Sequence, residues 1–87
     1  MAESILIVDD APAILTSLSK ILQDEGYQIA MAKSGQEALK MLGADPPDLM
    51  MLDIWMPELD GIETLKRARE QAPHVQVVMM SGHGNIE

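Results

Sequence analysis

Short apolar runs alternate along this chain with longer segments of helical periodicity, and this alternation restricts the possible folds more than any other feature. Residues 5–8, 49–52 and 75–80 are apolar, apart from Gln76, and show no polar alternation, which is typical of strands that helices cover on both faces. Residues 27–31 form a weaker, edge-like candidate strand. Strands that alternate with helical segments are typical of βαβ units, so the pattern predicts an α/β chain with a parallel sheet.

The segments between these runs carry helix start and stop signals. In the first segment, apolar side chains at positions 14, 15, 18, 21 and 22 form a one-sided stripe that Pro12 can open and Gly26 can close. The third segment is expected to end at Pro73. The sequence therefore predicts one helix after each of the first three strands.

Capping signals mark the starts of the second and third helices. Ser34 is followed three residues later by Glu37, a capping box in which each side chain is expected to satisfy the other's backbone N–H. This second helix is predicted to stop at Gly43. Asp60 and Glu63 repeat the same spacing at the start of the third helix.

Composition excludes several classes of function. At 87 residues the chain forms one domain at most. Fourteen acidic against six scattered basic residues give a net charge of −8, so we expect no direct binding to nucleic acid. The absence of cysteine excludes disulfides and thiolate metal sites and favours a cytoplasmic location. No secretory signal is recognisable, and no apolar run approaches the roughly 20 residues that cross a membrane.

Polar residues follow three of the predicted strands. Asp9 and Asp10 come after the first strand, Asp53 after the third and Ser81 after the fourth. In doubly wound parallel sheets, ligands bind at the carboxyl ends of the strands, where the strand order reverses. In the flavodoxin-like order 2-1-3-4-5 this point lies between strands 1 and 3, so Asp10 and Asp53 are predicted to be neighbours.

Carboxylates at the ends of adjacent strands, about 4.8 Å apart, need a cation to offset their charge. Oxygen ligands without cysteine or paired histidines favour Mg²⁺ over zinc. Mg²⁺ beside a carboxylate neutralises charge as a phosphoryl group is transferred to that oxygen. We therefore expect Asp53 to be the oxygen nucleophile and Ser81 to donate its hydroxyl to a phosphate oxygen.

Taken together, these residues resemble the receiver domains of bacterial response regulators. The resemblance rests on Asp9-Asp10, on Asp53-Ile54-Trp55-Met56-Pro57 and on Gly61 eight positions beyond Asp53. It implies that Asp53 is the phosphoacceptor, that Mg²⁺ is bound by Asp10, Asp53 and the Trp55 carbonyl, and that Asp9 supports the metal through water. Ser81 would be the switch hydroxyl, and a histidine kinase or phosphotransfer protein would be the phosphoryl donor.

The resemblance covers essentially all of the chain and implies strand order 2-1-3-4, with residues 1–87 forming a receiver domain that is incomplete at its C-terminus. Complete receivers add a fifth strand, which carries a lysine that pairs with the phosphate, and two further helices. A receiver is a signalling domain rather than an enzyme, and it controls an output domain in a longer parent. The run at 81–85 is similar to receivers attached to ATPase transcription activators, so a DNA-binding or ATPase output is expected.

Without the fifth strand, phosphoryl transfer is expected to be impaired, because one fixed positive charge is missing from the site. The fourth strand, at residues 75–80, also becomes an apolar edge without charge or proline. Such an edge is a template for pairing with another chain. We therefore expect the 87-residue chain to self-associate through this strand.

Each singled-out residue also has a simpler interpretation. Asp10 alone would be an N-cap of the helix that follows it, Ser81 with the next glycine would be a turn pair, and Trp55 would be a packing residue. Two other functions remain open: a receiver-like interaction module that takes no phosphate, and a small Mg²⁺-dependent phosphatase. The phosphatase is disfavoured because haloacid-dehalogenase-type enzymes place two aspartates two residues apart, whereas Asp9 and Asp10 are adjacent.

Overall fold

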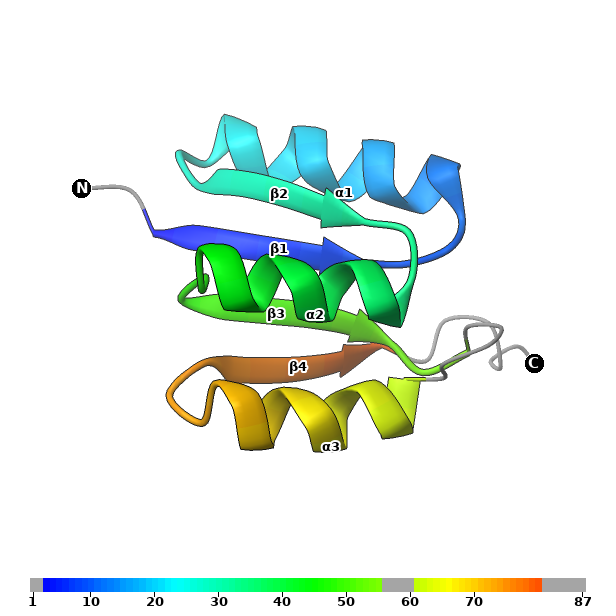
Figure 1. Ribbon diagram of the computed structural model, residues 1–87. Helices are drawn as coiled ribbons and strands as arrows, with labels where there is room; N and C mark the ends of the chain where they lie inside the picture. Colours follow the sequence, from blue (N-terminus) through cyan, green and yellow to red (C-terminus); the bar gives the residue numbers. More distant parts are fainter. Residues whose placement is uncertain (1–2, 56–60, 81–87) are drawn as a thin grey trace.

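The computed structural model describes residues 3–55 and 61–80, which form a parallel sheet with helices on both faces (Figure 1). The strand order is β2-β1-β3-β4, so the predicted α/β, flavodoxin-like arrangement with order 2-1-3-4 is confirmed. The elements in chain order are β1 (Ser4–Val8), α1 (Pro12–Asp24), β2 (Gln28–Ala32), α2 (Gly35–Ala44), β3 (Leu49–Asp53), α3 (Gly61–Gln71) and β4 (Gln76–Met80).

Two apolar clusters lie on opposite faces of the sheet because successive side chains of a strand point to opposite sides. On one face, Leu6 and Val8 of β1 pack with residues of α2 and α3, among them Leu42. On the other face, Ile5 and Ile7 pack with α1. Figure 1 shows α1 on one side of the sheet and α2 and α3 on the other. The central strand β1 is therefore buried from both sides.

The strand boundaries differ from the predicted ones by one residue at several ends. β2 begins at Gln28 rather than at residue 27, because the Tyr27 N–H donates to the Leu22 carbonyl at the end of α1 instead of entering the sheet. β4 begins at Gln76 because the Val75 N–H donates to the Ala72 carbonyl in a turn. β3 extends to Asp53. Local turn hydrogen bonds, which the apolar pattern does not reveal, decide these ends.

The prediction that helices cover both faces of β4 is wrong. Within residues 3–55 and 61–80, β3 is the neighbour of this strand, and β4 carries no fully buried residue. Val78 is 46% exposed. By contrast, β2 lies at the opposite edge of the sheet, as its edge-like sequence predicted.

The helix starts agree with the sequence signals in part. Pro12 is the first residue of α1, and Gly26 takes a positive φ of 98° just beyond the end of that helix. The Ser34 Oγ accepts a hydrogen bond from the Glu37 N–H at 3.1 Å. The reciprocal half of the predicted capping box is wrong by one residue, because Glu37 Oε1 accepts from the N–H of Lys33, at 2.7 Å, rather than from that of Ser34.

The remaining helix boundaries lie close to those expected. α2 continues one residue past Gly43 to Ala44, and α3 ends at Gln71, two residues before Pro73. Asp60, the predicted cap of α3, lies outside the described residues. None of the helices in the described ranges has the length and apolar character that crossing a membrane requires.

Candidate metal centre at the carboxyl ends of β1 and β3

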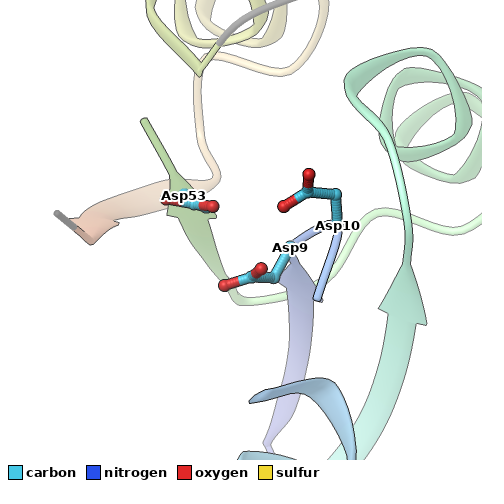
Figure 2. A group of neighbouring side chains, drawn as sticks. All are labelled: Asp9, Asp10 and Asp53. Atoms are coloured by element: carbon cyan, nitrogen blue, oxygen red, sulfur yellow. The ribbon is translucent and has the colours of Figure 1, made fainter. Parts of the chain in front are cut away.

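Three carboxylates converge where β1 and β3 end side by side. One oxygen each of Asp9, Asp10 and Asp53 lies within 4.8 Å of the others. Figure 2 shows Asp9 and Asp10 at the end of β1 and Asp53 on the neighbouring strand, with the side chains turned toward a common space. The structure therefore brings together the acidic residues that the sequence analysis singled out.

The backbone at this point is fixed by the parallel ladder. The Asp9 N–H donates to the Ala32 carbonyl at 3.1 Å, which continues the pairing of β1 with β2 beyond the last residue of β1. Asp53 is itself the last residue of β3 and pairs with Met80 of β4. From the apolar pattern, Asp53 was expected just after the strand. In the structure it lies within the strand, so its Cα is held by the sheet.

Two of the three carboxylates are removed from solvent. Asp9 is 4% exposed and Asp53 is 1% exposed, whereas Asp10 is exposed. Buried ionised carboxylates are costly unless they are paired, hydrogen-bonded or bound to a metal. The cluster therefore consists of two buried acids behind one acid at the surface.

The two buried carboxylates are each oriented by a backbone N–H two residues further on. Asp9 Oδ1 accepts from the Ala11 N–H at 2.9 Å, and Asp53 Oδ1 accepts from the Trp55 N–H at 3.1 Å. Aspartate favours such turns because its short side chain reaches the backbone two residues ahead. The turns that leave β1 and β3 thus fix the orientation of both carboxylates before any ion binds.

The simpler interpretation of Asp10, as the cap of α1, is wrong. The N-cap of that helix is Ala11, and no side chain caps it. A helix that begins with proline already lacks one of the N–H groups that a cap would satisfy. The Asp10 side chain lies instead beside Asp9 and Asp53.

The donor set fits Mg²⁺. Within residues 3–55 and 61–80, the cluster offers three carboxylates and no nitrogen or sulfur ligand, and hard oxygen ligands of this kind suit Mg²⁺. Trp55, two residues after Asp53, is 56% exposed, and the role of its carbonyl as a ligand stays a prediction. Ser81 lies outside the described residues, so its role as the switch hydroxyl is also a prediction.

Two features of the site were not predicted from the sequence. One is the pair of backbone N–H donors at Ala11 and Trp55, for which the aspartate two residues earlier is the only local signal. The other is the close approach of Gly61, the first residue of α3, to the backbone of Asp53 and Ile54. That approach joins residues that are up to eight positions apart in the sequence, so no local pattern reveals it.

Comparison with known proteins identifies the family. The family described as response regulator receiver domain matches residues 5–87. The chain is 48% identical over 89 residues to the nitrogen assimilation regulatory protein NtrX of Azorhizobium caulinodans, covering all of this chain and 20% of that protein. It is 39% identical to the sporulation initiation phosphotransferase F of Bacillus subtilis, covering all of this chain and 70% of that protein.

A solved structure of a response regulator is also similar to this chain. The response regulator protein TrrA of Thermotoga maritima, in complex with Mg²⁺ and BeF, superposes with a TM-score of 0.88 at 36% identity. The match covers 94% of this chain and 71% of that one. The chain therefore covers 70% of the sporulation phosphotransferase and 71% of the TrrA chain, but only a fifth of the NtrX protein.

Proposed function

This chain belongs to the family of response regulator receiver domains of two-component signalling, and we propose that it accepts a phosphoryl group on Asp53 with the help of Mg²⁺. The observation that carries the proposal is the convergence of three carboxylates, two of them buried, at the carboxyl ends of β1 and β3. A related protein, TrrA, has been solved with Mg²⁺ and BeF. That relative supports an ion of the same kind for this chain.

Asp9, Asp10 and Asp53, with the Trp55 carbonyl, are the groups that would hold Mg²⁺. When bound, the ion supplies positive charge beside the oxygen that receives the phosphoryl group. The sheet holds the backbone of Asp53 in place, and the Trp55 N–H orients its carboxylate. This fixed carboxylate needs little reorientation to attack, which lowers the entropic part of the barrier.

The proposed reaction is transfer from a phosphohistidine of a histidine kinase or phosphotransfer protein. A carboxylate oxygen of Asp53 forms a bond to phosphorus while the phosphorus–nitrogen bond of the donor breaks. The electron pair of that bond stays on the imidazole, which takes up a proton, and the product is an acyl phosphate on Asp53. Ser81 would then donate its hydroxyl to a phosphate oxygen as the switch residue.

The acyl phosphate would act as a conformational signal to an output domain of a longer parent protein. Because NtrX is a regulatory protein of which the chain covers 20%, we propose transcription control through a DNA-binding or ATPase activator domain. In this role the chain is a cytoplasmic phosphoacceptor rather than an enzyme. Its net charge of −8 favours a protein partner over direct contact with nucleic acid.

The test uses Trp55, the only tryptophan, as a reporter two residues from Asp53. We expect its fluorescence to change on addition of Mg²⁺ and to change again with beryllium fluoride, a mimic of the acyl phosphate. Asp53→Asn removes the nucleophile and one ligand charge and is expected to abolish the second response and weaken the first. Mass spectrometry after incubation with a phosphorylated kinase gives a direct readout of the acyl phosphate.

Asp45→Asn is the matched control. Asp45 lines a cavity of about 210 Å³ together with Ser4 and Gln28, at the opposite end of the strands, so both fluorescence responses are expected to persist. Binding of Mg²⁺ without any response to beryllium fluoride would favour an interaction module that takes no phosphate. Turnover of a small phosphate ester would favour a phosphatase. Absence of Mg²⁺ binding to the unsubstituted chain would contradict the proposed function.

A further inference from the structure

The first residue of α3 lies against the backbone that carries the proposed phosphoacceptor. Gly61 is buried, and a Cβ added to it would lie 2.5 Å from the Ile54 Cα and 3.0 Å from the Asp53 carbonyl carbon, with the Asp53 carbonyl oxygen closer still. Cβ atoms essentially never approach other atoms below 3.0 Å. All three neighbours are backbone atoms, so no change of side-chain rotamer relieves the overlap. Only glycine fits at this position without movement of the backbone.

A short chain of hydrogen bonds leads from Gly61 to the carboxylate of Asp53. The Gly61 N–H donates to the Ile54 carbonyl at 3.1 Å. That carbonyl belongs to the same peptide unit as the Trp55 N–H, which donates to Asp53 Oδ1 at 3.1 Å. Because a peptide unit is planar, fixing its oxygen also fixes the direction of its N–H. One peptide plane therefore connects the start of α3 with the side chain of Asp53.

We propose that Gly61 is a positioning residue: its lack of a side chain lets α3 hold the peptide between Ile54 and Trp55, and this peptide sets the orientation of the Asp53 carboxylate toward Mg²⁺. The inference rests on the proposed function, because it assumes that the acidic cluster binds the ion. It adds a residue outside the acidic cluster to the determinants of metal affinity.

Contacts along α3 hold this helix in place, so a side chain added at Gly61 is expected to displace the backbone near Asp53 rather than the helix. α3 is held along its length, since Thr64 and Ala68 are buried and the Gln71 side-chain amide donates to the Leu39 carbonyl of α2 at 2.8 Å. A methyl group at Gly61 requires about 1 Å of movement to reach ordinary carbon contact distances. With the rest of α3 anchored, we expect the turn that follows Asp53 to take up much of this movement.

The test compares Mg²⁺ affinity of the chain and its Gly61→Ala variant by Trp55 fluorescence, well below the melting temperature of both. We expect the affinity to fall about ten- to a hundredfold, as is typical when a residue that orients a metal ligand is replaced. The ¹³C chemical shift of the Asp53 carboxyl carbon is expected to change in the variant even without metal. This second readout reports orientation rather than stability.

Two control variants separate positioning from other effects. Gly43→Ala makes the same substitution inside α2, where the added Cβ meets only the Gln71 side-chain amide, at 3.3 Å. This amide needs to move by only a few tenths of an ångström, a shift small enough to keep its hydrogen bond to the Leu39 carbonyl, so Mg²⁺ affinity is expected to be unchanged. Ala68→Gly weakens α3 itself without any overlap, since glycine disfavours helix. It is expected to lower the melting temperature while leaving Mg²⁺ affinity within about twofold of the unsubstituted chain.

The outcomes distinguish this inference from the proposed function. Mg²⁺ affinity of Gly61→Ala equal to that of the unsubstituted chain would overturn the inference alone, as would an equal loss in Ala68→Gly. If the unsubstituted chain binds no Mg²⁺, both fail together. If Gly61→Ala does not fold, NMR on the unsubstituted chain provides the test. We expect a scalar coupling between the Gly61 nitrogen and the Ile54 carbonyl carbon across their hydrogen bond. We also expect the Gly61 amide resonance to shift when Mg²⁺ is added. If Mg²⁺ shifts the Asp53 resonances but leaves the Gly61 amide resonance unchanged, the inference is overturned.

Discussion

At the scale of single residues, the buried and the exposed aspartates of the acidic cluster have different roles. Asp9 and Asp53 are buried, and each accepts a hydrogen bond from a backbone N–H, so they contribute to the local structure of the turns as well as to the site. Asp10 is exposed and does not cap α1. Its contribution to the cluster is therefore mainly its negative charge.

Asp10→Asn tests this division. Loss of one of three carboxylate charges is expected to weaken Mg²⁺ binding at least about tenfold, because affinity for hard cations rises with the number of charged ligands. Without metal, the free energy of unfolding is expected to stay level or rise, since a like charge is removed from two neighbours. Fluorescence titration gives the first quantity and urea unfolding the second. A clear loss of stability in metal-free Asp10→Asn would contradict the division.

At the scale of secondary-structure elements, the helices that border the sheet start in different ways. α2 is capped by the Ser34 hydroxyl, with Glu37 accepting from the preceding backbone. α1 begins at Pro12 without a side-chain cap. Because α1 uses no aspartate as a cap, the two acids between β1 and α1 remain available to the proposed metal centre. The way α1 starts is thus part of how the site is built.

Ser34→Ala is expected to lower the free energy of unfolding by about 1 kcal/mol, because the Glu37 N–H loses its acceptor at the start of α2. Urea unfolding followed by circular dichroism measures this change. Ser17→Ala is the matched control, since Ser17 is an exposed residue within α1 and alanine favours helix there. Equal losses in the two variants would show that the Ser34 hydroxyl does not stabilise α2 as a cap.

At the scale of the whole molecule, the described helices cover the two faces of the sheet unequally. α2 and α3 pack on one face, and α1 packs on the other, mainly against β1 and β2. On the α1 side of β4, Val78 is 46% exposed, and the neighbouring Met51 and Met80 are only partly buried. The edge of the sheet at β4 therefore combines apolar side chains with a strand whose described neighbour is β3 alone.

From this surface we predict that the 87-residue chain self-associates through β4, since an apolar edge strand favours pairing with another strand. Size-exclusion chromatography with light scattering is expected to show a mass above 9.5 kDa at micromolar concentrations. Val78→Lys is expected to restore the monomer, because a charged lysine on an edge strand opposes pairing.

Met31→Lys provides the control for that measurement. Met31 is 47% exposed and lies on β2, the opposite edge strand, so this variant changes the net charge equally at the other end of the sheet. Its mass is expected to equal that of the unsubstituted chain. A monomer at all concentrations before substitution, or dissociation by Met31→Lys instead of Val78→Lys, would contradict association through β4.

The amino-acid sequence by itself determined the order of strands and helices, because apolar periodicity, Pro12 and the Ser34 cap act within a few residues of each other. It also predicted that the acids at the ends of the first and third strands would meet, since parallel strands end at one edge of the sheet. Of the expectations that failed, the start of β2 depends on a turn hydrogen bond that the apolar pattern does not reveal, whereas the covering of β4 concerns contacts between separate segments.

Only the tertiary structure decided which carboxylates are buried and why residue 61 must lack a side chain. Each of these features depends on where atoms of different elements lie relative to one another. Asp9 and Asp10 are adjacent in the sequence, yet one is 4% exposed and the other is at the surface. A linear pattern gives the kind of side chain at each position, whereas distance, burial and orientation arise only when β1, β3 and α3 pack together.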